Sequence, residues 1–421
     1  MSKSFKVLLS NPPWFTHDNR WGIRAGSRWP FTIPKGFSGY LPFPFLLAYT
    51  TSFLRENGID AYFIDSILTR ESIESYIERI KKNNFYWVII ETSTPSIDYD
   101  LKIAQEISKY TQVALCGPHA TVFADDLIKL PFVSAILKGE YEKNSLKLIK
   151  TGKQGIYDYD LVEDIDTLPF PYRDFSIYRY SDRFPNTPKG FQLQVWGSRG
   201  CPYRCIFCMW PPTMYLNKYR ARKPFFILKE IKETFDRFPK LTSVYFDDDT
   251  FNINKDRIFE ICEGMKKMEI PWAAMCRADT VDIDTFKKMK ESFCYAVKFG
   301  VESGCQELVN NCNKKLDLKV VEEVVKELKK IGIFVHLTFT WGLPGETKET
   351  IEKTKEFYRR VKPDSVQQSF CTPFPGTVYY EKLIQENKLN VDSWSKFDGA
   401  RDFIFIGTDM IREDLLRYAK L

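Results

Sequence analysis

Long apolar runs and several familiar ligand-binding signatures are missing from this chain. No apolar stretch approaches the ~18 residues that a membrane-spanning helix needs, so the sequence predicts no membrane span. The opening MSKSFKVLLSNPPW holds only a short apolar stretch and no signal-peptide pattern, which predicts a cytoplasmic protein. No Gly-x-Gly-x-x-Gly motif follows the first predicted strand, which argues against a nicotinamide dinucleotide site.

A strong charge of one sign is also missing. The 61 basic and 55 acidic residues leave a net charge of +6 over 421 positions, and the basic residues gather in no arm or stripe. We therefore expect no nucleic-acid partner. Histidine is scarce, with three in the chain, and none of them lies between His119 and Cys262.

What the chain does have is a long alternation of strand-like and helix-like segments. Before residue 140, helical patterns separate five strand-like runs, at 6–10, 60–65, 87–91, 112–116 and 134–139. This alternation predicts an α/β fold that begins with a Rossmann-like, doubly wound parallel sheet. Six more such runs follow, at 191–196, 243–247, 271–276, 294–301, 333–341 and 365–370. Six β/α units predict a partial (β/α)6 TIM-like barrel, because eight units would close one.

Composition divides the chain into four parts. We expect the Rossmann-like domain over 1–149, the partial barrel over 191–375 and a short C-terminal extension over 376–421. Residues 150–190 are rich in Pro, Tyr and charge, which predicts an irregular linker on the surface of the domains.

Small and polar residues recur where the strands of the first sheet end, and ligands of such sheets bind at that edge. The candidate binding residues there are Ser93, Thr94, Gly117, Pro118, His119, Gly139 and Glu140. A turn or helix cap is an equally good explanation for Ser93 and Thr94, and plain loop packing is one for His119. The aromatic and arginine-rich segment 21–32 is expected either to cover the sheet edge or to act as a lid.

Three cysteines crowd into one stretch, GSRGCPYRCIFCMWPP at 197–212, as Cys201-x3-Cys205-x2-Cys208. Three thiols cannot pair off into disulfides, whereas soft sulfur ligands suit iron–sulfur clusters and zinc. A structural zinc site needs four ligands, and no fourth Cys or His falls between His119 and Cys262. A four-iron cluster held by three cysteines leaves one iron open for a chelating ligand. The loop follows the first barrel strand, at the end where barrel chemistry takes place.

This loop resembles the signature of radical S-adenosylmethionine (SAM) enzymes, and the resemblance covers residues 191–375. It implies that Cys201, Cys205 and Cys208 hold one four-iron four-sulfur (4Fe–4S) cluster, whose open iron binds SAM. Reductive cleavage of SAM would yield a 5′-deoxyadenosyl radical that abstracts a substrate hydrogen. The resemblance also implies an electron donor such as flavodoxin or ferredoxin. The remaining alternative is a non-catalytic iron–sulfur or zinc protein.

Other barrel strand ends carry residues that the resemblance assigns to SAM. Asp247, Asp248 and Asp249 stand where the family has a Gly-Gly-Glu-like turn for the methionine amino group, and a helix-capping turn is the alternative. Arg277 could clamp a carboxylate or form a surface ion pair. The further candidates are Phe207 for a flat ring, Glu302 and Ser303 for ribose and carboxylate, and Gly342 for adenine.

The first 140 residues resemble the cobalamin-binding domain of one large branch of these enzymes, the class B methylase-like branch. The segments PFPFLLAYTTSFLRENGIDAYFID, ETSTPSIDYD and CGPHATVFADDLIKLPFVSAILKGEYE carry the likeness. The Asp-x-His-x-x-Gly signature of a cobalt-ligating histidine is absent, as is general in that branch. The resemblance implies cobalamin-dependent methylation of an unactivated carbon in a small-molecule, pigment, lipid or natural-product substrate. Cyclisation, ring contraction or another rearrangement, with or without functional cobalamin, is the alternative.

Overall fold

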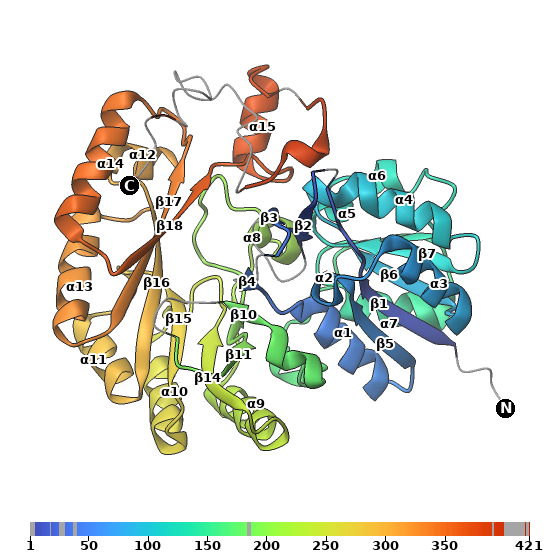
Figure 1. Ribbon diagram of the computed structural model, residues 1–421, viewed down its shortest axis with the longest axis horizontal. Coiled ribbons are helices and arrows are strands. Elements are labelled where there is room, and N and C mark those ends of the chain that lie inside the picture. The colour runs from blue at the N-terminus through green and yellow to red at the C-terminus, as the bar shows by residue number, and fades with distance from the viewer. Residues whose placement is uncertain are drawn as a thin grey trace.

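Two α/β units stand side by side in the computed structural model (Figure 1), which describes residues 5–16, 18–24, 30–36, 40–182, 187–389, 391–399, 417 and 421. Each unit is built on a six-stranded sheet. All neighbouring strands within both sheets run parallel. The predicted fold class is therefore confirmed.

The first sheet has the order β5-β1-β6-β7-β8-β9. Its strands are β1 (Lys6–Asn11), β5 (Asp60–Asp65), β6 (Trp87–Glu91), β7 (Gln112–Cys116), β8 (Ala135–Leu137) and β9 (Gly155–Tyr157). Every residue of β6 is buried, because helices cover both faces of the sheet. One face packs against α1 (Phe45–Glu56) and α7 (Glu142–Thr151), and the other against α3 (Ile73–Asn83) and α4 (Ile97–Ile107).

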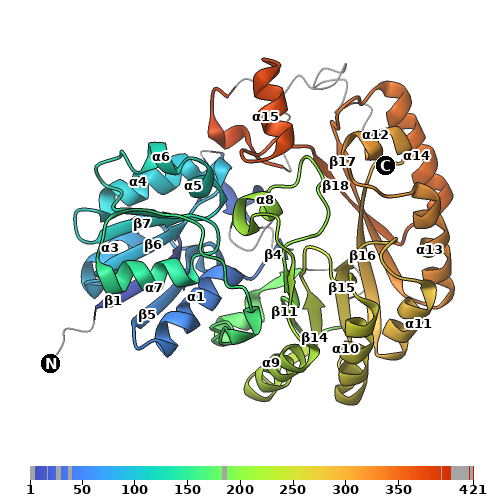
Figure 2. The same cartoon turned by 180° about the vertical axis from the view of Figure 1, so that it is seen from behind.

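The second sheet has the order β11-β14-β15-β16-β17-β18 and curls into a half-barrel (Figure 2). Its strands are β11 (Phe191–Val195), β14 (Leu241–Phe246), β15 (Trp272–Cys276), β16 (Cys294–Glu302), β17 (Phe334–Trp341) and β18 (Ser365–Phe370). The outer helices are α9 (Pro224–Arg237), α10 (Lys255–Met268), α11 (Ile283–Glu291), α13 (Leu318–Lys330) and α14 (Lys348–Val361). Successive strands are sheet neighbours, as consecutive β/α units require.

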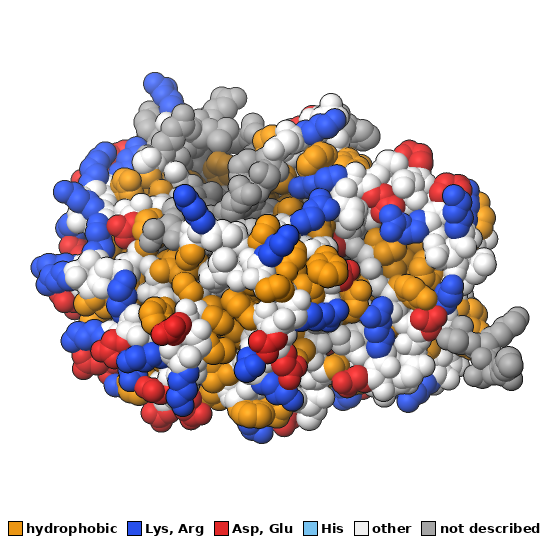
Figure 3. Space-filling view, turned by 60° about the horizontal axis from the view of Figure 1, so that its bottom comes forward, with side chains coloured by type: hydrophobic (Ala, Val, Ile, Leu, Met, Phe, Trp, Pro, Cys, Tyr) orange, Lys and Arg blue, Asp and Glu red, His pale blue; other side chains and the backbone are white. Residues whose placement is uncertain are grey.

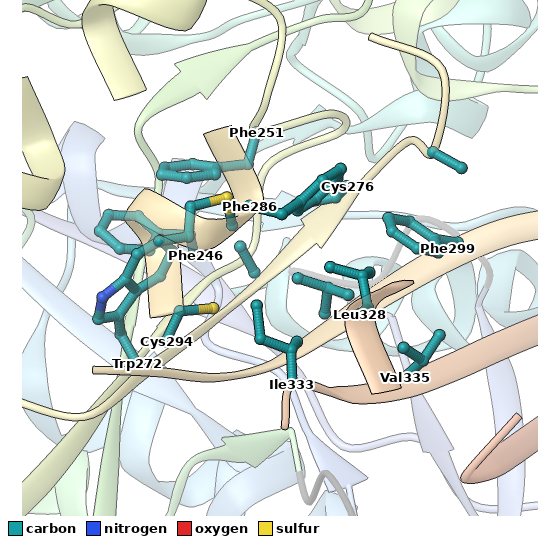
Figure 4. Close-up of a cluster of buried hydrophobic side chains, with 14 of the residues drawn as sticks. Phe246, Phe251, Trp272, Cys276, Phe286, Cys294, Phe299, Leu328, Ile333 and Val335 are labelled. Atoms are coloured by element: carbon teal, nitrogen blue, oxygen red, sulfur yellow. The ribbon is translucent and has the colours of Figure 1, made fainter. Parts of the chain in front are cut away.

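The main core of the half-barrel lies between its sheet and the outer helices. Phe246 stacks on Phe251, and Trp272 meets both rings edge-on (Figure 4). The buried thiols of Cys276 and Cys294 pack among these aromatic and aliphatic side chains. A reduced thiol behaves there as a small apolar group.

The segment expected to be a surface linker is built into both units instead. Its strand β9 extends the first sheet past residue 149. Ile177 lies in the barrel core, Tyr180 lies in a core of the first unit, and Arg173 is buried. The segment's local pattern looked irregular because its buried residues are spaced too unevenly to form a helical or strand-like stripe.

The remaining elements are short. Before the barrel they are β2 (Arg20–Ile23), β3 (Phe31–Pro34), β4 (Tyr40–Leu41), α2 (Ser66–Thr69), η1 (Thr94–Ser96), α5 (Pro118–Val122), α6 (Ala124–Leu127), η2 (Ile165–Thr167), η3 (Phe175–Arg179) and β10 (Ser181–Asp182). Within and after it they are β12 (Ser198–Arg199), α8 (Trp210–Tyr215), β13 (Arg220–Ala221), α12 (Gln306–Asn311), α15 (Val378–Gln385) and η4 (Trp394–Lys396). In both ribbon views α8 and α15 lie between the two units.

One apolar core crosses from the first unit to the second. It joins side chains of the first sheet and α1 to Trp196, Trp210, Met214 and Tyr215 of the barrel's first loop. Phe45 stacks on Trp196 with ring centroids 4.3 Å apart. The first barrel loop is therefore held against the first unit by direct packing.

The surface carries both signs of charge. On the face shown in Figure 3, basic and acidic side chains are interspersed with apolar patches. Among the described residues, no helix has the length and hydropathy required to cross a bilayer.

Candidate active site

The three-cysteine loop leaves the carboxyl end of β11 and is closed by the antiparallel pair β12–β13. Cys201, Cys205 and Cys208 are each partly exposed. Burial raises the pKa of the Cys208 thiol, and negative charge on Cys205, Asp249 or Cys201 would raise it further. The three thiols therefore lie within electrostatic reach of one another.

The donor set fits an iron–sulfur cluster better than a single metal ion. Within the described part of the chain, no three His, Cys, Asp or Glu side chains are grouped to hold one ion. A zinc site would need four ligands around one point. In a four-iron cluster each cysteine binds a different iron, so the thiols need not converge. Three partly exposed thiols on one loop satisfy that requirement.

Backbone hydrogen bonds fix the cysteine loop from two sides. The Ile206 N–H donates to the Cys312 carbonyl at 3.0 Å, and the Tyr379 N–H donates to the Ile206 carbonyl at 3.0 Å. The loop is thus held by the end of α12 and by α15 of the C-terminal extension. Gly200 has a φ of +81°, and a Cβ there would lie 2.1 Å from the Lys218 carbonyl oxygen. Phe207 is 4% exposed and packs in an apolar cluster beside the loop.

The structure gives different environments to the three aspartates after β14. Asp248 is fully buried and accepts hydrogen bonds from the Gly197 N–H, at 3.0 Å, and from the Ser198 hydroxyl. It therefore fastens the start of the cysteine loop. Asp249 is partly exposed, and its charge acts on Cys201 and Cys208. Asp247 is buried, and its N–H donates to the strand β11.

Arg277 lies next to the loop but is already engaged. Its guanidinium donates two hydrogen bonds to Asp279, at 2.9 and 2.8 Å, and one to the Lys315 carbonyl at 3.1 Å. Its other contact is with the Tyr203 ring, 3.6 Å from the centroid, between the first two cysteines. The Asp279 carboxylate occupies the fork that a ligand carboxylate would need.

Glu302 and Ser303 separate at the end of β16. Glu302 faces the loop, forms a 2.9 Å ion pair with Lys314 and accepts a hydrogen bond from Thr340. Ser303 instead bonds the Thr354 hydroxyl at 2.9 Å and accepts the Cys305 N–H at 3.0 Å, so its hydroxyl joins the start of α12 to α14. No local pattern indicated Lys314, because it stands in the connection between α12 and α13, outside every motif.

At the end of β17, the backbone of Gly342 adopts a φ of +82° and its N–H donates to the Glu346 carboxylate. Glu346 is fully buried, and burial raises its pKa to about 8. The acid is therefore protonated at neutral pH, and it closes the turn rather than presenting a charge.

Glu140, a predicted binding residue of the first sheet, joins the two units. Its carboxylate accepts hydrogen bonds from Arg199 at 2.9 Å and from Arg220 at 2.8 and 2.7 Å. Arg199 also pairs with Glu142 at 2.7 Å. All four side chains are at most 8% exposed. These arginines belong to β12 and β13, the strands that close the cysteine loop.

The other predicted residues of the first sheet support its carboxyl edge. Ser93 caps η1, and the hydroxyl oxygen of Thr94 lies 3.2 Å from the Nδ1 of His119. His119 lies against Phe123 and Trp394, and burial lowers its pKa to about 3, so the imidazole is neutral.

Two glycines of this edge permit close packing. A Cβ on Gly117 would lie 2.5 Å from the Thr92 carbonyl oxygen, and one on Gly139 would lie 2.4 Å from the Tyr159 ring. Pro118 follows Gly117 as the first residue of α5. The carboxyl edge of the first sheet is polar, and its side chains contact one another.

Arg24 covers the same edge from the β2–β3 hairpin, and sequence reasoning missed its role. Its fully buried guanidinium pairs with Asp100 at 2.9 Å and donates to Asn11 and to the Pro12 carbonyl. The described part of segment 21–32 therefore covers the sheet edge, while residues 25–29 lie outside the described residues.

Comparison with known proteins identifies the class. Residues 197–358 match the model of the Radical SAM superfamily. A Pyrococcus horikoshii protein described as an uncharacterized methyltransferase is 29% identical over 381 residues, which are 84% of this chain and 81% of that one. The anaerobic magnesium-protoporphyrin IX monomethyl ester cyclase of Cereibacter sphaeroides is 27% identical over 387 residues, 84% of this chain but 62% of the cyclase.

Two solved structures have the same two-unit fold as this chain. The methyltransferase TsrM from Kitasatospora setae, solved with cobalamin and a 4Fe–4S cluster, superposes with a TM-score of 0.68 at 15% identity, over 91% of this chain and 75% of TsrM. The cobalamin-dependent enzyme OxsB superposes with a TM-score of 0.73 at 15% identity, over 96% of this chain and 65% of OxsB. The chain shares the fold of cobalamin-dependent radical SAM enzymes.

Proposed function

We propose that this protein is a cobalamin-dependent radical SAM enzyme that methylates an unactivated carbon of a small-molecule substrate. One observation carries the proposal. The three-cysteine loop at the carboxyl edge of the half-barrel is bonded through Arg199 and Arg220 to Glu140 at the carboxyl edge of the first sheet. Both ligand-binding edges therefore meet at one place, as chemistry that uses two cofactors on one substrate requires.

Cys201, Cys205 and Cys208 would hold the cluster. When bound, a 4Fe–4S cluster supplies the electron that cleaves SAM and so starts hydrogen abstraction from the substrate. Asp249 would pair with the methionine ammonium of SAM, a role that its electrostatic effect on two of these thiols supports. Phe207 and the apolar cluster around it exclude water from one side of the loop.

The inner wall of the half-barrel is the proposed substrate space. Alternate residues of its strands pack outward into the core, so the intervening residues face inward. These inward residues are largely polar and include Gln192, Gln194, Ser243, Tyr245, His336, Thr338 and Thr340. This polarity favours a substrate that carries hydrogen-bonding groups.

We propose that the first unit binds cobalamin. Its fold and the polar carboxyl edge of its sheet support this proposal. When bound, cobalamin supplies the methyl group. Ser93, Thr94 and His119 are the side chains of this edge that could contact a corrin. Because His119 is enclosed by Phe123 and Trp394, we propose no bond from it to cobalt. A cyclisation is the second candidate, favoured by the match to the protoporphyrin ester cyclase.

The test is anaerobic purification followed by iron, sulfide and cobalt analysis and a SAM cleavage assay with dithionite. We expect iron and sulfide in four-to-one ratio to protein, corrin absorbance that survives iron chelation, and 5′-deoxyadenosine as product. Cys208→Ala should lose the iron, the sulfide and the 5′-deoxyadenosine. Cys262→Ala, which removes a buried thiol from α10 in the core between the sheet and the outer helices, should keep them. Zinc in place of iron would refute the proposal.

A further inference from the structure

The chain after α15 lies against the carboxyl edge of the first sheet. Both ribbon views draw this part of the C-terminal extension close to α5. Its short helix η4 begins at Trp394, whose indole ring meets the His119 ring edge-on with centroids 5.2 Å apart. The Phe123 ring lies 5.1 Å from the same indole. Residues 391–399, which we call the strap, therefore adjoin the edge at which cobalamin is proposed to bind.

The strap is fastened to both units of the protein. Phe397 is 1% exposed and packs in the apolar core that crosses from the first unit to the half-barrel, and Val391 packs against the same core. The carbonyl oxygen of Gly399 accepts the Phe370 N–H of β18 at 3.1 Å. Trp394 stands between these anchored positions and remains partly exposed. The packing of the strap thus holds the indole at the sheet edge.

A buried carboxylate ties the strap to the β2–β3 hairpin. Asp398 is 2% exposed and accepts hydrogen bonds from the Thr32 N–H, at 3.0 Å, and from the Thr32 hydroxyl. Thr32 in turn accepts two hydrogen bonds from Arg20, at its hydroxyl oxygen and at its carbonyl oxygen. The same hairpin leads to Arg24, which covers the sheet edge. Asp398 therefore joins the two segments that lie over this edge.

The strap gives the edge an aromatic wall. The side chains at the strand ends are largely polar, whereas a cofactor pocket encloses most of its ligand and is lined mainly by apolar and aromatic side chains. Phe123 and Trp394 are both partly exposed, so each ring still has surface to offer a ligand. They flank His119, which is 3% exposed. A corrin is a broad ring, and aromatic faces next to a polar edge suit its packing.

We propose that the strap completes the cobalamin site of the first unit. Trp394 is the binding residue, whose indole would lie against the corrin, and Asp398 is the residue that positions the strap. This inference rests on the proposed function. Removal of the indole would leave part of the bound cofactor exposed to water, and the lost apolar contact would speed its release. The C-terminal extension, to which no sequence motif assigns a role, would thus belong to a cofactor site.

The experiment measures the release of hydroxocobalamin from the full-length protein, purified without oxygen and loaded with this cofactor. After dilution, gel filtration at intervals and visible absorbance of the protein fraction give the dissociation rate. Trp394→Ala should release hydroxocobalamin about tenfold faster or more, because it removes a large apolar contact. Trp394→Phe keeps an aromatic ring at the same place, and its dissociation rate should stay close to that of the wild-type protein. Since Trp394 is partly exposed, both variants should fold.

Two aspartates of the strap provide a matched pair of variants. Asp398→Asn weakens the bonds to Thr32 and should also speed release about tenfold, because hydrogen bonds to a buried charge are strong. Asp392→Asn changes an acid of the same strap that pairs with Lys396 at the surface, where both side chains are about half exposed. It should leave the dissociation rate unchanged.

A purely structural role for the strap would lower the thermal unfolding midpoint of the cobalamin-free variants and leave the dissociation rate as it is. Unchanged release from Trp394→Ala would therefore overturn the inference. So would equally fast release from Trp394→Ala and Trp394→Phe, or from Asp398→Asn and Asp392→Asn. A wild-type protein that binds no hydroxocobalamin would refute the proposed use of cobalamin together with this inference, whereas unchanged release refutes this inference alone.

Discussion

Replacing Glu140 by Gln should destabilise the protein strongly and loosen the cysteine loop. Glu140 is fully buried and accepts three hydrogen bonds, at 2.7 to 2.9 Å, from Arg199 and Arg220. The change leaves two buried guanidinium groups against a neutral amide. Breaking a buried ion pair by removing one partner costs about 3–5 kcal/mol. Because Arg199 stands two residues before Cys201, the same variant should retain less iron.

Glu163→Gln is the matched control. Glu163 pairs with Lys218 at 2.8 Å, but their side chains are 70% and 51% exposed. Such surface pairs contribute about 0–1 kcal/mol. Urea unfolding followed by circular dichroism gives both free energies of unfolding, and iron analysis gives cluster retention. The reasoning is refuted if the two variants lose equal stability, or if Glu140→Gln binds iron as fully as the wild-type protein.

Acid titration gives a further check on the same residue. Burial is the largest single influence on the pKa of Glu140 and raises it, but Arg199 and Arg220 together outweigh burial, so the pKa is lowered. A lowered folded-state pKa means that the stabilisation is present above the unfolded-state pKa of about 4.3. It is lost as pH falls through the folded-state value. Glu140→Gln should therefore narrow its stability gap from the wild-type protein as the pH is lowered.

Three more predictions concern single sites. Burial raises the pKa of Glu346 to about 8. The stability that this residue contributes is therefore fully present below its unfolded-state pKa and is lost as the pH rises through 8. Glu346→Gln should raise the thermal unfolding midpoint at pH 8 and not at pH 4. Gly200→Ala should abolish iron binding because its Cβ would meet a carbonyl oxygen 2.1 Å away, whereas Gly152→Ala, also at positive φ but with open space, should retain it. Asp248→Asn should lower the free energy of unfolding by about 1–3 kcal/mol, because it weakens the hydrogen bonds from Gly197 and Ser198 at the start of the loop. Asp249→Asn should instead weaken the binding of SAM, which equilibrium dialysis measures.

Local patterns in the sequence were enough to predict the strands and the cysteine loop. Strand β6 reads WVIIE and is buried throughout, and the spacing of the three cysteines lies within one loop. Strand β9 was missed because it has only three residues and lies at the sheet edge, where burial is incomplete. A pattern of that length carries no periodicity.

Other contacts could not be predicted from the sequence because the residues that form them lie far apart along the chain. Glu140 was read as a binding residue because it follows a strand, but its partners Arg199 and Arg220 lie 59 and 80 positions away. The pairing of Glu302 with Lys314 depends on a strand irregularity and on the space at Gly300. Such features arise from the packed structure and leave no repeating signal along the chain.

The core shared by the two units limits how such enzymes can diversify by exchanging parts. A recombination at the boundary near residue 190 would strip Trp196, Trp210 and Tyr215 of the apolar neighbours that cover them in the first unit. It would also leave the buried guanidinium groups of Arg199 and Arg220 without the Glu140 carboxylate that pairs with them. A viable swap between relatives would have to transfer the antiparallel pair β12–β13 and the loop between them together with the first unit, so both segments should be inherited as one block.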